Sequence, residues 1–471
     1  MARKLFRTAD ANGITEGVIW KQLLLFFFPI MLGTFFQQLY NTIDAVIVGN
    51  FVGKEALAAV GGATGNLINL LVGFFVGLAS GATVIISQYY GAGDVKGVSK
   101  AVHTSAALAI ISSVILTVGG VTLSPVILRL MGTPEDIMGH ATVYVCIFFG
   151  GIFFSMVYNI GSGILRAVGD SKRPLYYLIV CCAVNTVLDL LFVAVFKWGV
   201  AGAALATVIA QAVSAVLVLM ALVRTELAYR LDLKAIRIDP EIFKGILRIG
   251  IPAGLQSMMY SSSNLIVQTK INSFGTDVVA AWTAFGKLDS FFWMIVSAFG
   301  IAITTFVGQN FGARKYDRMH KSVRTCLMMT SVATILLSVL FVTVGRYLYM
   351  LFTQDEAVIA SGMEMVRFQA PWYIAYICIE ILAGAVRGAG DSVVPTVITC
   401  FGICVLRISW LLIAVPLRPM LTTVMAGYPI TWVLTSSLFI IYYLHGGWLK
   451  KRIRAVHGEE ELQRYLASHK K

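Results

Sequence analysis

The chain contains two copies of one long pattern, and this repeat limits its possible folds more than any other feature. The stretch LRAVGDSKRP at 165–174 returns as VRGAGDSVVP at 386–395, which is 221 positions later. Gln88 and Gln309 keep the same spacing of 221 positions. A chance motif does not hold one spacing over so much of a chain. The sequence therefore predicts two homologous bundles in tandem, with a substrate path between them.

The composition places both bundles in a membrane. Of 471 residues, 58% are hydrophobic and only 13% are charged, whereas soluble globular proteins carry ~25% charged residues. The apolar runs are about 20 residues or longer, which is the length a helix needs to cross ~30 Å of hydrocarbon, while barrel strands are shorter and alternate. We therefore predict an all-α integral membrane protein.

The apolar runs predict twelve transmembrane helices, six in each half, in the order that the repeat requires. The predicted spans are 22–49, 56–86, 101–123, 138–163, 175–196, 198–222, 245–270, 278–306, 324–345, 358–385, 393–416 and 421–445. The corresponding domains are an N-terminal tail at 1–21, a six-helix lobe at 22–223, a linker at 224–244, a second six-helix lobe at 245–447 and a C-terminal tail at 448–471.

The basic residues predict the orientation. An even number of spans puts both termini on one side, and Lys and Arg gather on the cytoplasmic side of membrane proteins. One set of connections is rich in them, including Lys100, Arg173, Lys234, Arg314 and Lys315, whereas the other has little beyond Lys54, Arg129, Lys197, Arg346 and Arg418. We expect a multi-pass protein of the cell (inner) membrane with cytoplasmic termini. The net charge of +13 follows the membrane boundary, so we expect no nucleic-acid partner.

Two patterns of uncharged residues predict contacts, one between helices and one with the membrane surface. Gly73, Gly77 and Gly81 recur at four-residue spacing and would form a smooth strip for close helix contact. The linker carries Leu227, Leu231, Leu233 and Ile236 on an apolar side, which we expect to lie on the membrane surface.

Acidic residues inside the first bundle are the main candidates for ion chemistry. A charged side chain at membrane depth costs at least ~2.5 kcal/mol and needs a reason. Asp189 lies four residues after Asn185, so both side chains share a helix face. With Asp44 and Thr207 they would form an oxygen-rich pocket that suits a proton or a sodium ion. A purely structural polar network is the alternative. The second half does not repeat this set, because Leu406 and Trp410 occupy the equivalent positions of Asn185 and Asp189.

The second half offers substrate-cavity candidates instead. Glu380 would either meet the charge of a cationic substrate or pair with a buried base such as Arg407 or Lys287, and both roles remain open. Lys287 and Asp289 lie in one predicted span and would screen each other in the cavity lining. Gln37, Tyr40 and Trp282 complete the candidate lining.

No sequence motif indicates an ATP motor or an enzyme. The chain shows neither a G-x-x-x-x-G-K-[ST] loop nor an H-E-x-x-H pair, and no nucleophile, base and orienting group recur at usable spacing. An ion gradient is the simplest remaining energy source. We expect no cofactor, no bound metal apart from a possible sodium ion at the acidic pocket, and a monomer.

Several motifs together resemble the multidrug and toxic compound extrusion (MATE) family of transporters. They are YNTID at 40–44, QYYGAG at 88–93, GQNFGA at 308–313, N-x-x-x-D at 185–189 and both copies of R-x-x-G-D-S. The resemblance implies two six-helix lobes in a V shape, and export of cationic or amphipathic compounds in exchange for protons or sodium ions.

The resemblance also implies where the coupling ion binds. Cation-site residues of the family's N-terminal lobe map onto Asp44, Asn185, Asp189 and Thr207. Some members instead use acids in helices seven and ten, but here helix seven offers YSSS at 260–263 without an acid. A lipid-linked sugar flippase of the same superfamily is the alternative function, and it would be expected to show a more cationic cavity. A channel that conducts without coupling is a further alternative.

Overall fold

The computed structural model describes residues 13–350 and 355–468, and their regular structure is entirely helical. Parts of the predicted tails, residues 1–12 and 469–471, lie outside the described residues. The chain divides into two compact units: unit 1 comprises mainly Leu24–Met258, and unit 2 comprises Met259 onward together with Thr15–Leu23. The two units group residues that contact one another, whereas the predicted lobes were drawn from the sequence repeat. The units therefore do not test the lobe boundaries, which stay a prediction.

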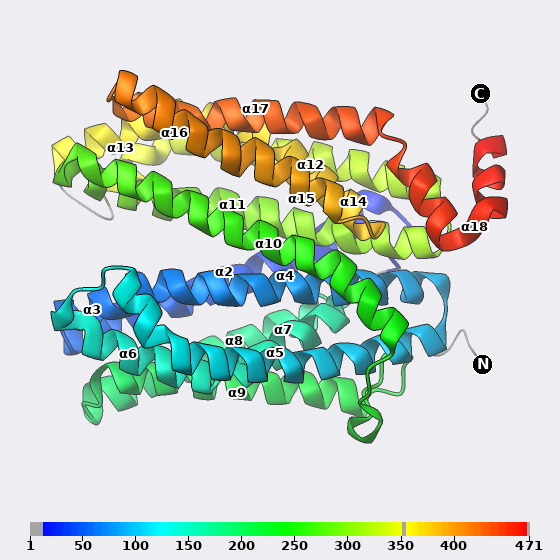
Figure 1. The fold of residues 1–471 in the computed structure, drawn as a ribbon, viewed down its shortest axis with the longest axis horizontal. Helices are drawn as coiled ribbons and strands as arrows, with labels where there is room; N and C mark the ends of the chain where they lie inside the picture. The colour runs from blue at the N-terminus through cyan, green and yellow to red at the C-terminus, as the bar shows by residue number, and fades with distance from the viewer. Residues whose placement is uncertain (1–12, 351–354, 469–471) are drawn as a thin grey trace. The chain divides into compact units, whose positions relative to one another are not determined.

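Unit 1 is a bundle of long helices that run side by side (Figure 1). Its elements are α2 (Ile19–Phe51, of which the first five residues belong to unit 2), α3 (Lys54–Gly61), α4 (Ala63–Ala92), α5 (Val95–Leu130), α6 (Glu135–Gly150), α7 (Ile152–Ala167), α8 (Lys172–Asp189), the π-helix η1 (Leu190–Val195), α9 (Gly199–Arg224), the 3-10 turn η2 (Leu233–Ala235) and most of α10 (Pro240–Ile271).

Unit 2 repeats this plan with the rest of the chain. Its elements after α10 are the 3-10 turn η3 (Asn272–Phe274), α11 (Thr276–Gly312), α12 (Tyr316–Tyr349), α13 (Glu356–Gln369), the 3-10 turn η4 (Ala370–Trp372), α14 (Tyr373–Gly388), α15 (Val393–Thr399), the π-helix η5 (Cys400–Val405), α16 (Leu406–Leu417), α17 (Leu421–His445) and α18 (Trp448–Ser468).

The predicted membrane-spanning helical architecture is confirmed. Among the described residues, ten helical segments are long and apolar enough to cross a membrane, and the pair α6 and α7, bent by 50°, makes an eleventh. The twelfth long helix is α10, at the place of the predicted seventh span. It has 32 residues but is less apolar than the others, because Lys244, Arg248 and the YSSS stretch lie in it.

Irregularities of the helices are duplicated along with the sequence. The predicted fourth span is broken at Gly151, where a Cβ would collide with Val208. The predicted tenth span is interrupted at the equivalent place by η4, which contains Pro371. A proline lacks the N–H that an α-helix needs, and it favours such a break. The bend therefore belongs to the repeated design, although the two halves reach it with different residues.

The duplicated R-x-x-G-D-S motif forms the same helix-ending turn twice. Gly169 and Gly390 have φ values of 96° and 93°, a left-handed conformation that glycine adopts without strain. Asp170 then accepts hydrogen bonds from the first backbone N–H groups of α8 and pairs with Arg173 at 3.2 Å. Asp391 instead accepts from the Tyr442 hydroxyl at 3.2 Å. In both copies the motif ends one helix; the first copy also caps the next helix, whereas the second contacts α17.

The predicted glycine strip of α4 makes the close helix contact expected of it. A Cβ at Gly77 would lie 2.6 Å from the Cα of Gly254 in α10, and one at Gly73 would lie 2.7 Å from the Ser257 hydroxyl. Any side chain at these positions would therefore push the two helices apart.

The linker packs on protein and not mainly on the membrane surface. Leu231 is 2% exposed and belongs to the hydrophobic core of unit 1, against which Leu227 and Ile236 also pack. Only Leu233 remains exposed. The linker is fixed further by Asp239, which pairs with Lys100 at 2.9 Å, and by the Asp232 N–H, which donates to His103 Nε2 at 3.1 Å. The expectation of a membrane-surface contact is thus wrong for most of this apolar side.

The C-terminal tail, α18, consists of two docked helical segments in unit 2, which meet at Gly458, where φ is 87°. Ile453 and Leu462 of α18 are buried. His457 stacks on Phe311 with 4.8 Å between ring centroids, and its Nδ1 lies 2.8 Å from the Tyr316 hydroxyl. Burial lowers the pKa of His457, and the nearby Arg314 lowers it further.

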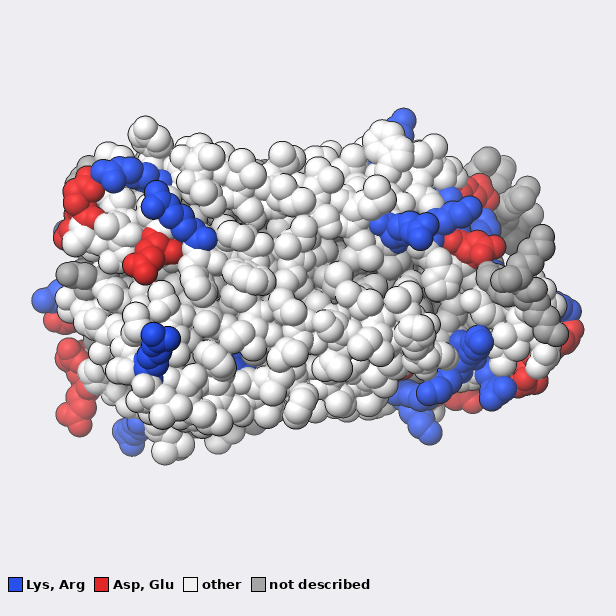
Figure 2. All heavy atoms as spheres, turned by 90° about the horizontal axis from the view of Figure 1, so that it is seen from above, with Lys and Arg blue, Asp and Glu red and all other residues white. Residues whose placement is uncertain are grey.

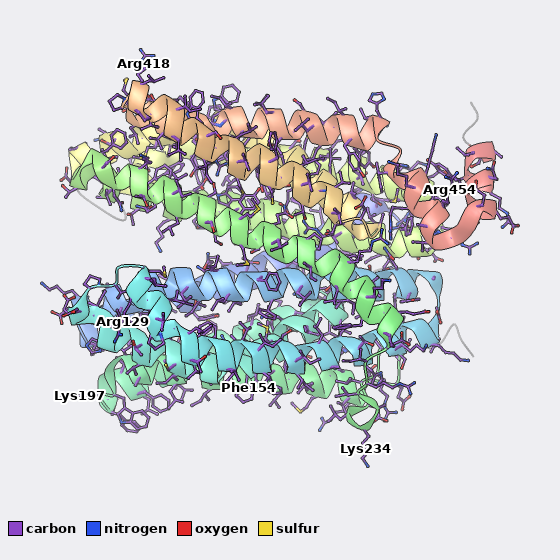
Figure 3. All side chains as sticks on the ribbon, viewed as in Figure 1. Arg129, Phe154, Lys197, Lys234, Arg418 and Arg454 are labelled. Atoms are coloured by element: carbon purple, nitrogen blue, oxygen red, sulfur yellow. The ribbon has the colours of Figure 1, made fainter. Side chains whose placement is uncertain are left out.

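Charged residues mark the two ends of each unit. On the face drawn in Figure 2, Lys, Arg, Asp and Glu gather near both ends, and a nearly uncharged band separates them. In unit 1, Arg129 and Lys197 lie at one end and Lys234 at the other; in unit 2, Arg418 and Arg454 lie at opposite ends (Figure 3). This separation agrees with the two sets of connections in the sequence. The choice of the cytoplasmic side remains a prediction.

Candidate ion and substrate sites

The structure gathers the predicted ion-site residues inside unit 1. Asp44 comes from α2, Asn185 and Asp189 from the last turns of α8, and Thr207 from α9; all four are at most 5% exposed. The Asn185 amide donates to the Thr207 hydroxyl at 3.5 Å, at the upper limit for a hydrogen bond. Asp44 and Asp189 lie close enough for their charges to interact.

Most carboxylate oxygens of this acid pair lack a hydrogen-bond partner. Both carboxylate oxygens of Asp189 and Oδ1 of Asp44 are buried with no hydrogen-bond partner, and so is the amide oxygen of Asn185. Buried polar atoms are normally hydrogen-bonded, because an unmet one is costly. Two neighbouring carboxyls with bare oxygens can lower that cost by taking up a proton or a cation.

Tyr144 of α6 is a member of this site that the sequence did not reveal. Its ring is buried, and its hydroxyl lies beside Asp44 and Thr207. A tyrosine in an apolar span gives no signal of its own, because most aromatic residues in membranes pack or face lipid. Only the fold shows that this one meets the acids.

The helix geometry changes at this site. The α-helical part of α8 ends at Asp189, and the π-helix η1 follows at once. Wider turns of this kind often mark functional sites. Here the change of helix type directly follows the more deeply buried acid of the pair.

Unit 2 contains a cavity of about 320 Å³ among α10, α11, α13, α16 and α17, and two predicted residues line it. They are Trp282 and Asp289 of α11. Asp289 accepts hydrogen bonds from the Tyr373 hydroxyl and the Trp293 indole, each at 2.6 Å. Lys287 is exposed, and in the described part of the chain no ion pair joins it to Asp289. Neutral donors, and not Lys287, therefore hold this carboxylate.

Glu380 of α14 is linked to the same cavity through two tyrosines. The Tyr376 hydroxyl donates to Glu380 at 3.4 Å, and the Tyr260 hydroxyl, which lines the cavity, lies 2.9 Å from that of Tyr376. Within residues 13–350 and 355–468, no ion pair joins Glu380 to Arg407 or Lys287. Arg387, in the last turn of the same helix, interacts with Glu380 electrostatically, so both roles of Glu380 stay open.

The remaining candidates, Gln37 and Tyr40, lie in α2 of unit 1. Tyr40 is buried, whereas Gln37 is exposed. Tyr40 lies beside Gln37 and Gln211. These two candidates therefore belong to unit 1, whereas Trp282 and Asp289 belong to unit 2.

The chain is similar to known transporters over most of its length. The MatE family model matches it twice, at residues 29–191 and 252–413, one match in each half. The "Probable multidrug resistance protein YpnP" of Bacillus subtilis (strain 168) is 30% identical over 93% of this chain and 98% of its own length.

Solved structures share the fold. One is a MOP superfamily transporter from Pyrococcus furiosus, described as having a binding pocket of reverse polarity that suggests a different function; its TM-score is 0.87, with 22% identity over 94% of this chain and 99% of its own. Another is a MATE protein in a bent conformation, with a TM-score of 0.87 and 23% identity over 98% of this chain and 100% of its own. The double match to the family model and the full-length similarity to the Bacillus protein show that this chain belongs to the MatE family, whose members are membrane transporters.

Proposed function

We propose that this protein is a secondary active multidrug exporter, which expels cationic or amphipathic compounds in exchange for protons or sodium ions by alternating access. The names of its relatives support drug export, since several are called multidrug resistance or multidrug export proteins. The absence of a nucleotide-binding loop from the sequence favours an ion gradient as the energy source.

The acid pair of unit 1 carries this proposal. Asp44 and Asp189 are buried within membrane-spanning helices, and three of their four carboxylate oxygens have no hydrogen-bond partner. Asn185 and Thr207 add an amide oxygen and a hydroxyl, which are ligands that sodium accepts. A proton on either carboxyl would lower the cost of burial equally well. The pair is therefore the coupling site of the proposed exchange.

Exchange follows if ion and substrate favour different conformations. The ion stabilises the state in which the acid pair is closed around it, and the substrate stabilises another state. Each then weakens the binding of the other by the same factor. Glu380, joined to the cavity through Tyr376 and Tyr260, is the acid that would attract a cationic substrate in unit 2.

The flippase alternative receives less support from the residues. A pyrophosphate group requires several basic side chains, but the unit 2 cavity presents Asp289 beside a single arginine, Arg407. Drug export accounts better than a flippase function for the aromatic side chains that line this cavity.

Accumulation of several unrelated cationic dyes in a pump-deficient bacterial host tests the function. Cells that express the protein should accumulate less of each dye than cells with an empty vector, and collapse of the ion gradients should abolish the difference. Glu135→Gln, which removes an exposed acid, is a control that should export like the parent. Equal accumulation with and without the protein across the panel, with its presence in the membrane verified, would contradict drug export.

A further inference from the structure

The linker of unit 1 borders an apolar groove on the bundle. The groove has a volume of about 100 Å³ among α5, α7, α9 and the linker, and every residue that lines it is apolar or glycine. Ile110 of α5 and Phe153 of α7 are exposed at its edge, and so is Leu233 of the linker, at 58%. Exposed apolar side chains around a groove of a membrane protein mark a contact with lipid.

A basic pocket adjoins the apolar groove on the same linker. It has a volume of about 340 Å³, and its charged lining residues are Lys100, Lys234, Arg237 and a single acid, Asp239. Ile236 lines both the pocket and the groove. The two spaces are therefore parts of one surface, with basic residues at one end and apolar residues at the other.

Helix α5 continues from the basic pocket into the apolar groove. Ser99 and His103 line the pocket, and Ala106 and Ile110 line the groove. Steps of four, three and four residues keep these side chains on one face of the helix. Eleven residues of α-helix span about 16 Å, which is enough to lead from the headgroup layer of a bilayer into its hydrocarbon core.

Two cations of the basic pocket have no counter-ion. Lys100 pairs with Asp239 at 2.9 Å, whereas Lys234 and Arg237 form no ion pair with any residue that the structure describes. The Lys234 backbone N–H donates to the Asp232 carboxylate at 3.0 Å, which fixes the turn that carries this lysine, and Arg237 lies close enough to Lys100 for their charges to repel. A phosphate group would accept hydrogen bonds from these cations and relieve their repulsion.

Only an anionic amphiphile fits the basic pocket and the apolar groove together. A free phosphate ester would use the pocket alone, and a neutral apolar compound would use the groove alone. An acyl chain gains little on moving from the bilayer into the groove, because lipid tails are as apolar as leucine. The charges of the pocket therefore supply most of the affinity, and the groove fixes the place of the chain.

We propose that the linker of unit 1 forms a binding site for one anionic phospholipid. The phosphate lies at Lys234 and Arg237, and an acyl chain lies in the apolar groove beside Leu233. The site goes beyond the proposed export function, since its occupation requires neither a drug nor an ion gradient.

The test is lipid binding to the purified full-length protein in detergent, with bound lipids counted by native mass spectrometry. Dioleoylphosphatidylglycerol is the anionic probe, dioleoylphosphatidylcholine is a zwitterionic probe with the same chains, and glycerophosphoglycerol is the anionic headgroup without chains. The first phosphatidylglycerol should bind roughly tenfold or more tightly than phosphatidylcholine, because each basic residue near a membrane surface adds to the attraction of anionic lipid. Equal affinity for the two lipids would overturn the proposal. Displacement of phosphatidylglycerol by an equal concentration of glycerophosphoglycerol would also overturn it, because the occupant would then be a free phosphate ester.

Paired variants assign the preference to the basic pocket. Lys234→Gln combined with Arg237→Gln removes two exposed charges. It should weaken phosphatidylglycerol binding roughly tenfold and leave phosphatidylcholine within about twofold. Lys172→Gln combined with Lys244→Gln is the matched control, since it removes two exposed lysines of the same predicted membrane side that line neither space. A preference that survives in the first variant, or that falls equally in the control, would contradict the assignment.

A third comparison tests the apolar groove. Ala106→Phe fills part of the groove and should weaken phosphatidylglycerol binding severalfold, whereas Ile111→Phe, at an exposed position of α5 outside the groove, should leave it unchanged. If Ala106→Phe does not give a monodisperse protein with a cooperative thermal transition, Leu233→Asn serves in its place, because it puts a polar group at an exposed edge of the groove. Unchanged phosphatidylglycerol affinity in the groove variant that folds would contradict the placement of the acyl chain.

Discussion

The two units share one ancestral plan but bury different sets of charged residues. In unit 1 the π-helix η1 starts directly after Asp189, and the interior holds an acid pair with bare oxygens. In unit 2 the π-helix η5 ends two residues before Arg407, and the interior holds this arginine together with Asp289 among aromatic rings. A repeat thus preserves helices, bends and turns, whereas the few buried charges have diverged. In the exchange that we propose, this divergence assigns the coupling ion to one half and the substrate to the other.

The largest effect is expected from removing the deeper acid of unit 1. Asp189→Asn keeps the shape of the side chain but removes the group that binds a proton or a cation, so gradient-driven drug transport should fall by about 100-fold or more. Drug binding to the purified variant should persist, because the unit 2 cavity is untouched. Drug uptake into inside-out vesicles under imposed proton or sodium gradients measures transport, and equilibrium binding to the purified variant measures drug affinity. Parent-like pumping under both gradients would show that the ion site lies elsewhere, with Glu380 as the next candidate.

Substitution of Glu380 in unit 2 should have a different effect from substitution of Asp189 in unit 1. Glu380→Gln should weaken the binding of cationic substrates by roughly tenfold and leave neutral substrates unaffected, because only the charge contact disappears. Tyr376→Phe is the matched control, since it removes the hydrogen bond to Glu380 and keeps the charge. Competition binding with a cationic and a neutral compound distinguishes these outcomes. An equal loss for both compounds in Glu380→Gln would indicate a structural role.

Where the units are alike, equivalent substitutions should have equal effects. Gly169 and Gly390 have almost the same positive φ, so Gly169→Ala and Gly390→Ala should each destabilise the protein by about 1–2 kcal/mol, the cost of a left-handed conformation for alanine. Thermal unfolding followed by intrinsic fluorescence compares the two. A loss confined to one variant would mean that the duplicated turns are not equivalent.

The smallest effect concerns the segments that follow the sixth predicted span of each half. Because the folded-state pKa of His457 lies below its ordinary value of 6.5, the docking of α18 should be strongest above that pH and weaken as pH falls through it. The linker of unit 1 should not respond in this range, because its bond with Lys100 holds the pKa of Asp239 below its ordinary value of 3.8. Hydrogen exchange of residues 448–468 and 225–239 at pH 7.5 and 5.5, corrected for intrinsic rates, measures both. Equal changes in the two segments, or a pH response that persists in His457→Gln, would refute this account.

The sequence predicts the fold well because repeats and apolar runs are local signals. The 221-residue spacing and the span lengths lead directly to twelve long helices in two halves, and Gly73 and Gly77 mark a real helix contact. The buried position of Leu231 was not predictable, because an apolar side that packs on protein reads the same as one that lies on a membrane.

The sites were predictable only in part. Asp44, Asn185, Asp189 and Thr207 stand out because polar residues in apolar spans are rare, and the structure gathers them. The contribution of Tyr144 depends on helix rotation and on contacts between distant segments, which no spacing encodes. Likewise, the charges on Lys287 and Asp289 are visible in the sequence, but only the structure shows that Tyr373 and Trp293 satisfy the carboxylate.

The central claim is that the acid pair of unit 1 and the drug compete through one conformational equilibrium. The most direct measurement is the affinity of the purified parent and of Asp189→Asn for a cationic drug, titrated against pH and, separately, against sodium at constant ionic strength. The parent should bind the drug more weakly as protons or sodium ions rise, and Asp189→Asn should lose that dependence. The claim would be contradicted if the drug affinity of the parent did not change with pH or with sodium concentration. It would also be contradicted if Asp189→Asn kept the same dependence on these ions as the parent.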